Sequence, residues 1–257
     1  MITRPVIITR PLAQAIVLAD QVEAIGRQAE VFPLLEIHSL VDTRALDDTL
    51  SNLVHFALVA FVSPNAVHAV FSRIQHWPEG LPIAVMGAGS RAALAEHAIT
   101  DANASIISPI HPERTDSETL LEVLDFSILD GREVLIVRGE NGRELLADAL
   151  RSRGVSVTQI AAYQRVAPEF TLQNQQKLKS MLERENDWIV TSSEALRNLL
   201  EWVKVLDLDN SVAKMQRQNI FVPHVRIAET AQILGFQSIT LTGSGDGSLL
   251  VALQSHP

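Results

Sequence analysis

The chain has 257 residues, of which 47% are hydrophobic, and a mean hydropathy of +0.15, which is typical of a globular protein with one large core or two smaller ones. Its formal net charge of −9 excludes long-range attraction to nucleic acid, because no basic stripe overrides the total. The lack of cysteine excludes disulfides, thiolate nucleophiles, zinc ribbons and iron–sulfur clusters, and it fits a reducing compartment.

Targeting and metal-binding patterns are also missing from the sequence. The opening MITRPVIITRPL has arginines where a signal peptide has its apolar centre, and the longest wholly apolar run, FALVAFV at 56–62, is too short to span a membrane. The eight histidines form no close pair such as H-x-x-x-H, so no metal site is predicted. The chain is therefore expected to be cytoplasmic, without contact to membranes.

In the first part of the chain, three apolar strands are each followed by a turn and an amphipathic helix. An extended stretch, EVFPLLEIHSL at 30–40, separates the first of these units from the second. The turns after the three strands carry Arg10, then Ser63 with Asn65, then Gly87, Gly89 and Ser90.

The same order returns in the second part. Val134 to Val137 predicts a buried strand, Gly139 to Gly142 a turn, and the following residues a helix with one apolar face. A second extended stretch, VSVTQIAAYQRVAP, comes next. The turns after the three strands of this part carry Arg138, then Ser192 with Ser193, then the Pro223 to Arg226 segment.

These two parts are related as an internal repeat. Residues 5–31 align without gaps on 133–159, so that Arg10 meets Arg138 and Gly26 meets Gly154. FALVAFVSPNAVHAVF aligns almost in the same register with NDWIVTSSEALRNLLE, and residues 83–99 match 220–236 more weakly. Strand-turn-helix units repeated in this way predict an α/β protein with two similar lobes, each a parallel sheet flanked by helices.

The two extended stretches are suited to paired strands that link the lobes. If the chain crosses over and back there, lobe one comprises 1–37 plus 167–257 and lobe two comprises 38–166. The repeat alone leaves a second arrangement open, in which each half of the chain forms one lobe.

The predicted strand ends are rich in hydroxyl groups, glycines and helix N-termini, which bind anions through backbone N–H groups and the helix dipole. For any single serine or asparagine the alternative is an ordinary helix cap, and for Arg138 it is a solvent-exposed strand end. Hydrolase and nucleotide-binding readings lack their motifs, because there is no G-x-S-x-G, no third glycine in MGAGSRAAL and no lysine in TGSGDGSLL. Tyr163, the only tyrosine, is a candidate weak acid or else a packing residue of the second extended stretch.

An ordered set of strings spans nearly the whole chain: VIITRP, FVSPNAVHAVF, AVMGAGSRAAL, VLIVRGENGRELLADALRSRGVSVTQIAAYQRV, WIVTSSEALRNLL and RIAETAQILGF. The most specific is RG-x-x-GR-x-x-L…G…Y-x-R. Together they resemble the uroporphyrinogen-III synthase family. The resemblance implies the crossed architecture, with two flavodoxin-like lobes joined by a two-stranded connection and a cleft between them.

The resemblance also implies the reaction of a cyclising hydro-lyase in heme biosynthesis that needs no cofactor. Its substrate would be hydroxymethylbilane, a linear tetrapyrrole with acetate and propionate arms. Loss of water gives an azafulvene, and attack by the substituted carbon of the terminal pyrrole forms a spiro intermediate that recloses as uroporphyrinogen III with that ring inverted. A monomer is expected, with transient contact to the preceding pathway enzyme.

By position, Tyr163 matches the tyrosine that the family is thought to use near the leaving hydroxyl. The other residues carried over are substrate-binding candidates: Arg10, Ser63, Asn65, Ser90, Arg138, Gly139, Ser192, Ser193 and Arg226. VPHVRIAET departs from the family by having His224 and Val225 in place of small hydroxyl residues, so donation there passes to backbone groups or Arg226. The net negative charge predicts positive potential only locally, at Arg10, Arg138 and Arg91.

A rival interpretation from another class is a two-lobed protein that binds a small anion without chemistry. It predicts the same lobes. It gives no reason for the lone phenol, and such proteins usually carry a signal peptide or a DNA-binding segment, neither of which the sequence indicates.

Overall fold

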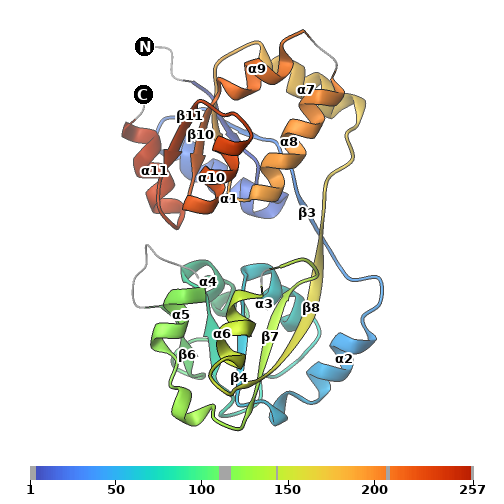
Figure 1. Cartoon of the computed structure of the whole chain (residues 1–257), viewed down its shortest axis with the longest axis vertical. Helices are drawn as coiled ribbons and strands as arrows, with labels where there is room; N and C mark the ends of the chain where they lie inside the picture. Colours follow the sequence, from blue (N-terminus) through green and yellow to red (C-terminus); the bar gives the residue numbers. More distant parts are fainter. Residues whose placement is uncertain (1–3, 110–116, 143, 207–208, 256–257) are drawn as a thin grey trace. The chain divides into compact units, whose positions relative to one another are not determined.

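The computed structural model describes residues 4–109, 117–142, 144–206 and 209–255. The chain divides into two compact units: unit 1 comprises Met1–Glu36 and Val166–Pro257, and unit 2 comprises Ile37–Arg165. The chain therefore passes from unit 1 into unit 2 and back again (Figure 1).

Unit 1 is built on a five-stranded sheet whose strands all run parallel. Numbered along the chain within the unit, the spatial order is 2-1-3-4-5, the flavodoxin-like order. In that order the strands are β2 (Ala29–Val31), β1 (Val6–Ile8), β9 (Asp187–Ile189), β10 (Asn219–Val222) and β11 (Ser238–Leu241). The helices are α1 (Leu12–Ala24), α7 (Leu172–Leu182), α8 (Ser193–Val205), α9 (Ser211–Gln216), α10 (Val225–Ile233) and α11 (Asp246–Ser255).

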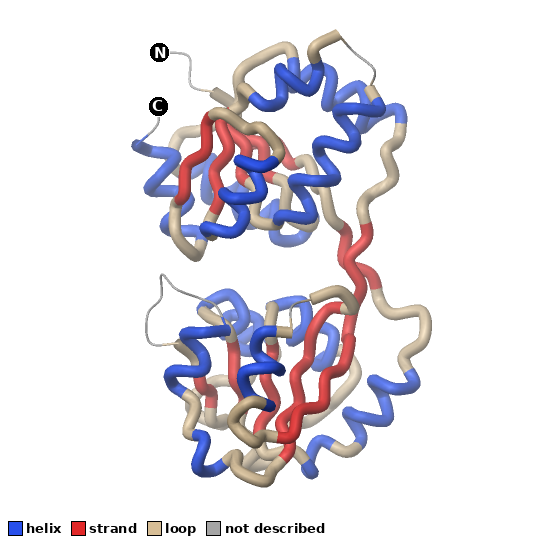
Figure 2. Tube along the Cα trace, in the orientation of Figure 1, coloured by secondary structure: helices blue, strands red, loops and turns tan. Residues whose placement is uncertain are grey.

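Helices cover both faces of this sheet (Figure 2). Because successive side chains of a strand point to opposite faces, Val6 and Ile8 pack with α1 and α11, whereas Ile7 packs with α7, α8 and α10. All three of these β1 side chains are fully buried, as expected for a central strand of a parallel sheet.

Unit 2 contains a six-stranded sheet, in which β8, β7, β4, β5 and β6 again pair parallel to one another. Its spatial order is β3 (Glu36–His38), β8 (Ser156–Val166), β7 (Glu133–Gly139), β4 (Leu58–Phe61), β5 (Ile83–Val85) and β6 (Ile106–Ile107). Its helices are α2 (Arg44–Ser51), α3 (Pro64–Phe71), α4 (Ala88–Glu96), α5 (Ser117–Val123) and α6 (Leu145–Arg151), with short 3-10 turns at Leu53–His55 and Phe126–Ile128.

The core of unit 2 also has two layers. Leu135 and Val137 pack with α2, α3 and α4 on one face, whereas Val134 and Ile136 pack with α5 and α6 on the other. These findings confirm the predicted α/β class with parallel sheets flanked by helices. β3 and β8, which come from the two extended stretches, are neighbours at the edge of this sheet.

The internal repeat extends to the strand register. Val6 pairs with Asp187 and Ala29, and its repeat partner Val134 pairs with Leu58 and Val157, which are the aligned positions. The helix ends repeat as well, because the aligned glycines Gly26 and Gly154 both adopt positive φ, at 80° and 81°. Glycine is suited to this left-handed conformation after a helix, so the two glycines end equivalent helices.

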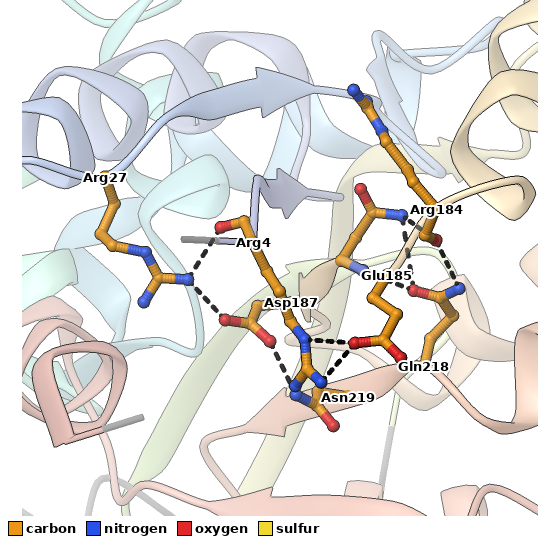
Figure 3. Close-up of polar contacts among 8 residues, drawn as sticks. Arg4, Arg27, Arg184, Glu185, Asp187, Gln218 and Asn219 are labelled. Carbon is orange, nitrogen blue, oxygen red and sulfur yellow. Dashed lines mark hydrogen bonds and ion pairs between the residues drawn. The ribbon is translucent and has the colours of Figure 1, made fainter. Parts of the chain in front are cut away.

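A buried polar network lies at the amino ends of the unit 1 strands (Figure 3). Arg27 Nη2 lies 2.5 Å from Asp187 Oδ2, with side chains only 6% and 1% exposed, and Asn219 Nδ2 donates to Asp187 Oδ1 at 2.8 Å. Arg27 also donates to the backbone carbonyls of Arg4 and Leu253, at 2.9 and 2.8 Å. The network ties the start of the sheet to the end of α11, far from the carboxyl ends of the strands.

Among the described residues, none of the helices combines the length and the apolar character needed to cross a membrane.

Candidate active site

Each sheet has a point where the strand order changes direction, between β1 and β9 in unit 1 and between β7 and β4 in unit 2. Open parallel sheets bind ligands outside the carboxyl ends of their strands at such points. In unit 1, Arg10 and Ser192 follow the two strands concerned. In unit 2, Arg138 is the penultimate residue of one strand and Ser63 follows the other. The predicted candidates therefore flank the switch point of each sheet.

Tyr163 lies on β8 with only 5% of its surface exposed. Its Oη is 3.0 Å from Ser63 Oγ, and Ser63 Oγ also accepts a hydrogen bond from the Ala66 N–H at 3.2 Å as the N-cap of α3. Since the serine hydroxyl has one hydrogen to give, it can donate that hydrogen to the phenol oxygen. The phenol proton is then available to a third group.

Gly139 allows the backbone of β7 to approach this phenol closely. A Cβ atom at Gly139 would lie 2.9 Å from Tyr163 Cζ and 3.1 Å from its hydroxyl oxygen, closer than side chains tolerate. The next residue, Glu140, donates its N–H to the Tyr163 carbonyl at 2.8 Å. The last residue of β7 thus positions the tyrosine ring from one side, and the Ser63 cap does so from the other.

Arg138 is buried at the end of β7 and is bonded to a carboxylate of its own unit. Its Nη1 lies 2.6 Å from Glu144 Oε1 and 2.5 Å from Gln159 Oε1. The bond from Gln159 and then the bond from Arg138 lower the pKa of Glu144 below its ordinary value. A Cβ atom at Gly142 would lie 2.6 Å from Arg138 Nη2, so the turn holds the guanidinium tightly.

Asn65 and Tyr163 both line a hollow of about 230 Å³ at the flank of the unit 2 sheet. Helix α3 contributes Asn65 and His68 on one helical face, and the edge strands β3 and β8 contribute His38 and Tyr163. Ile37, Ser39, Ala69 and Ala162 complete the lining. The structure thus brings one predicted binding residue beside the predicted acid.

Ser90 and Arg91 begin α4. Ser90 is only 4% exposed and sits where the repeat has Ile227, a core residue of unit 1. Arg91 Nη1 lies 2.5 Å from Asp101 Oδ2, and its Nη2 donates to the Ile106 carbonyl and Ser108 Oγ at 3.2 and 3.1 Å. The positive charge of Arg91 is therefore balanced within unit 2.

In unit 1, Arg10 pairs with Asp246 at the start of α11, with 2.7 Å between Nη1 and Oδ1. Ser192 caps α8, accepting from the N–H groups of Glu194 and Ala195 at 3.1 and 3.4 Å. These contacts hold Arg10 and Ser192 at the switch point of the unit 1 sheet.

Ser193 and Arg226 come from the starts of α8 and α10. Ser193 Oγ lies 3.0 Å from Thr230 Oγ1, which is also 2.9 Å from the Arg226 carbonyl. Arg226 is exposed. One threonine thus links the N-terminal turns of both helices.

Within unit 2, the structure brings Tyr163, Ser63 and Gly139 together and places Asn65 in the adjoining hollow. The Arg138 side chain instead donates to Glu144 and Gln159. The sequence prediction did not include His38 and His68. A signal existed for His68, because it follows Asn65 by three residues and so shares its helical face.

Hydrogen-bond donors are the main polar groups at the carboxyl ends of the strands in both sheets, and unit 2 adds the phenol of Tyr163. In the described part of the chain, no group of three or more His, Cys, Asp or Glu side chains could hold a metal ion. Such an arrangement can bind carboxylates, orient a flexible ligand and supply one proton from a weak acid.

Comparison with known proteins gives a consistent result. A family model described as uroporphyrinogen-III synthase HemD matches residues 16–242. The uroporphyrinogen-III synthase of Salmonella typhimurium (strain LT2) is 29% identical over 252 residues, covering 97% of this chain and 99% of the relative. The synthase of Escherichia coli (strain K12) is also 29% identical, over 254 residues with the same coverage.

Solved structures share the fold. The uroporphyrinogen-III synthetase of Helicobacter pylori 26695 aligns with a TM-score of 0.62 at 16% identity, covering 99% of this chain and 100% of that one. A mutant uroporphyrinogen III synthase of the extremely thermophilic bacterium Thermus thermophilus aligns with a TM-score of 0.58 at 15% identity and 98% coverage of both chains.

Proposed function

The chain belongs to the uroporphyrinogen-III synthase family and acts in the cyclisation step of tetrapyrrole biosynthesis, and we propose that it closes hydroxymethylbilane to uroporphyrinogen III without a cofactor. The observation that carries the mechanism is the hydrogen bond between Tyr163 and Ser63, 3.0 Å long, at the switch point of the unit 2 sheet.

The reaction makes modest demands on acid–base groups and strict demands on geometry. A pyrrole nitrogen pushes electrons toward the hydroxymethyl carbon, so a weak acid suffices to release its oxygen as water. The enzyme must then direct attack to the substituted carbon of the terminal ring, because the unguided closure leaves that ring uninverted. A preference of about 1.4 kcal/mol between the two attacks changes the product ratio tenfold.

Tyr163 would donate the proton. Its O–H bond breaks as the proton passes to the leaving hydroxyl, the carbon–oxygen bond breaks, and water departs to leave a protonated azafulvene, an azafulvenium cation. Ser63, donating to the phenolate oxygen while its own oxygen stays bonded to the Ala66 N–H, would stabilise the charge left behind. After the spiro intermediate fragments and recloses, the last-bonded carbon releases one proton, which restores the phenol.

Both carboxyl edges would hold the acetate and propionate arms of the substrate. On unit 2 we assign this role to Ser63, Asn65, Ser90, Arg138 and Gly139, and on unit 1 to Arg10, Ser192, Ser193 and Arg226. Backbone N–H groups at the starts of α3, α8 and α10 support it, because helix N-termini bind anions without a dense positive patch. This suits a chain with a net charge of −9.

We assign the two groups of binding residues to two lobes, one formed by 1–37 with 167–257 and the other by 38–166. The chain would work as a monomer in the cytoplasm and receive its unstable substrate through transient contact with the enzyme that makes it. Light scattering of the purified protein tests whether it is a monomer. Cross-linking during turnover tests the transient contact with the enzyme that makes the substrate.

The decisive experiment supplies freshly made hydroxymethylbilane to the purified protein without added cofactor, oxidises the product and separates the porphyrin isomers by chromatography. We expect predominantly the type III isomer. Only the type I isomer, formed at the rate of a protein-free control, would contradict the proposed reaction and favour the anion-binding interpretation.

A further inference from the structure

Two histidines of unit 2 form a contact beside the hollow that Tyr163 lines. His68 Nδ1, on α3, lies 3.1 Å from His97 Nε2 at the end of α4. The His97 ring stacks on Phe71, with 5.2 Å between ring centroids and 18° between planes. Because the contact needs one donor and one acceptor, at most one of the two rings can be protonated at both nitrogens and so carry a positive charge.

The surroundings of His97 disfavour a positive charge on that ring. Burial lowers the pKa of His97 below its ordinary value, and the nearby His68 lowers it further. His68 is 42% exposed and lines the hollow, so its charge is better solvated. A protonated His68 donating through Nδ1 to a neutral His97 satisfies both rings.

Among the residues that the structure describes, the following titratable groups lie near His68. From α4 these are His97 and Glu96, whose carboxylate is 68% exposed and 3.9 Å from His68 Nε2, at the limit of an ion pair. The edge strands contribute His38 and Tyr163 to the same hollow. The three arginines predicted to attract anions are each paired at 2.7 Å or less with a carboxylate of their own unit: Arg10 with Asp246, Arg91 with Asp101 and Arg138 with Glu144.

We propose that the hollow lined by His38, Asn65, His68 and Tyr163 is a subsite for one carboxylate arm of the tetrapyrrole substrate, with His68 as its charge-bearing group. This assignment rests on the proposed function and deepens it. The Asn65 side chain supplies a neutral amide beside the imidazolium, and Tyr163 in the lining joins the subsite to the site of proton donation.

The size of the hollow supports one arm rather than the whole substrate. Its volume of about 230 Å³ lies below the ~300–1,000 Å³ of pockets that enclose a drug-sized ligand. An acetate or propionate arm with part of its pyrrole ring fits this space, while the rest of the chain lies outside it. Anchoring one ring beside the phenol fixes the position from which the linear substrate folds.

The subsite gives substrate binding a defined pH dependence. A carboxylate binds the protonated form of His68 preferentially, and histidines charge between about pH 5 and 8, where the carboxylates of the substrate stay ionised. We therefore expect a carboxylate arm to bind more tightly at the acidic end of this window than at its alkaline end.

The test measures kcat and KM for hydroxymethylbilane between pH 6 and 8 (about the range in which an imidazole titrates). For His68→Gln we expect KM at pH 6 to rise about tenfold with kcat unchanged, and its pH dependence to disappear. His68→Lys, which stays charged, should keep a low KM across the range. His76→Gln, at an exposed histidine of the same unit, is the matched control and should leave both parameters unchanged.

A second readout does not depend on turnover. The His68 ring is followed by NMR while a monopyrrole with one acetate and one propionate arm is added at pH 7. We expect its resonances to move toward the protonated form and those of His76 to stay. Wild-type KM values in a folded His68→Gln protein, or no movement of the His68 resonances, would overturn the subsite. Failure to form the type III isomer would count against the proposed function instead, since the NMR titration is independent of it.

Discussion

Apart from the additional edge strand β3 of unit 2, the two units have the same strand order and register, yet the amino ends of their sheets are built differently. In unit 1 the buried ion-pair network is formed by the residue before β2 and by the first residues of β9 and β10. The positions of unit 2 that align with these three carry apolar residues or proline. The pairs are Arg27 with Val155, Asp187 with Leu58, and Asn219 with Pro82. The fold therefore accepts either solution at this place, and the buried ion pair is a property of unit 1 alone.

The carboxyl edges differ in another way. Ser63 and Ser192 cap equivalent helices, and each accepts a hydrogen bond from the N–H three residues on, Ala66 or Ala195, so their capping role belongs to the shared architecture. The long strand β8 carries Tyr163, and continuing the repeat alignment by four residues puts Leu35 of unit 1 at that position, where it is a core residue. The proposed chemistry is thus concentrated in unit 2, while both units retain the means to hold anions.

Tyr163→Phe tests this asymmetry most directly. Loss of a general acid should lower kcat about 10²–10⁴-fold, while the fold, followed by circular dichroism, stays intact. The matched variant at the aligned position, Leu35→Met, should leave kcat unchanged and cost less than about 1.5 kcal/mol of unfolding free energy. Near-wild-type turnover of Tyr163→Phe would reduce the tyrosine to a positioning residue and assign the proton to water.

The buried ion pair at the amino ends of the unit 1 strands is tested by replacing its residues with those at the aligned positions of unit 2. Asp187→Leu alone leaves Arg27 buried without its carboxylate and should lower the unfolding free energy by about 3–5 kcal/mol in denaturant titrations. Adding Arg27→Val recreates the apolar pair of unit 2 and should recover part of that loss. Recovery stays incomplete because the Arg4 and Leu253 carbonyls lose their donor. If the two effects simply add, the charges are not coupled.

The Arg138–Glu144 pair tests how unit 2 binds anions. Arg138→Ala should raise KM for hydroxymethylbilane about tenfold, whereas Glu144→Gln removes a competing carboxylate and should lower KM modestly, by about two- to threefold. Both are read from steady-state kinetics at pH 7. Unchanged KM in both variants would exclude Arg138 from substrate binding.

The same pair has a pH signature in the wild-type protein. Because the folded state lowers the pKa of Glu144 below its ordinary value of 4.5, the stabilisation is present above that value and is lost as pH falls through the lower pKa of the folded protein. The loss should be absent from Glu144→Gln in acid unfolding experiments.

Much of the fold could be predicted because strand and helix patterns, caps and turn glycines are local signals that occur twice. Val134 to Val137 is an apolar run that predicts a strand by itself, and its repeat partner at the start of the chain confirms the unit. The alignment of 5–31 with 133–159 also matches positions that are equivalent in the two sheets, because Val6 and Val134 pair with aligned residues.

The site was harder to predict from the sequence than the fold, because its contacts join residues far apart in the chain. Ser63 and Tyr163 are 100 residues apart, and His68 meets His97 across two helices. Counting close ligand pairs could not find that histidine contact, since the spacing is set by packing. Nor could a pattern show that Glu144 and Asp246 pair with Arg138 and Arg10, because many surface carboxylates could have done so.

The smallest expected effect concerns the residues that follow α4 and α10, the third pair of repeated helices. The two units place different residue types there in the same left-handed backbone conformation. Ala98 and its aligned partner Gly235 both adopt positive φ, at 60° and 85°. Alanine costs about 1–2 kcal/mol there, and the greater entropy of glycine in the unfolded chain offsets part of the gain from relieving this strain, so Ala98→Gly should stabilise unit 2 by about 0.5–1 kcal/mol. Gly235→Ala should do the reverse and more, because its Cβ would also meet Gln216 Nε2. Thermal unfolding of both variants checks the pair, and equal destabilisation by both would show that alanine is not strained at position 98.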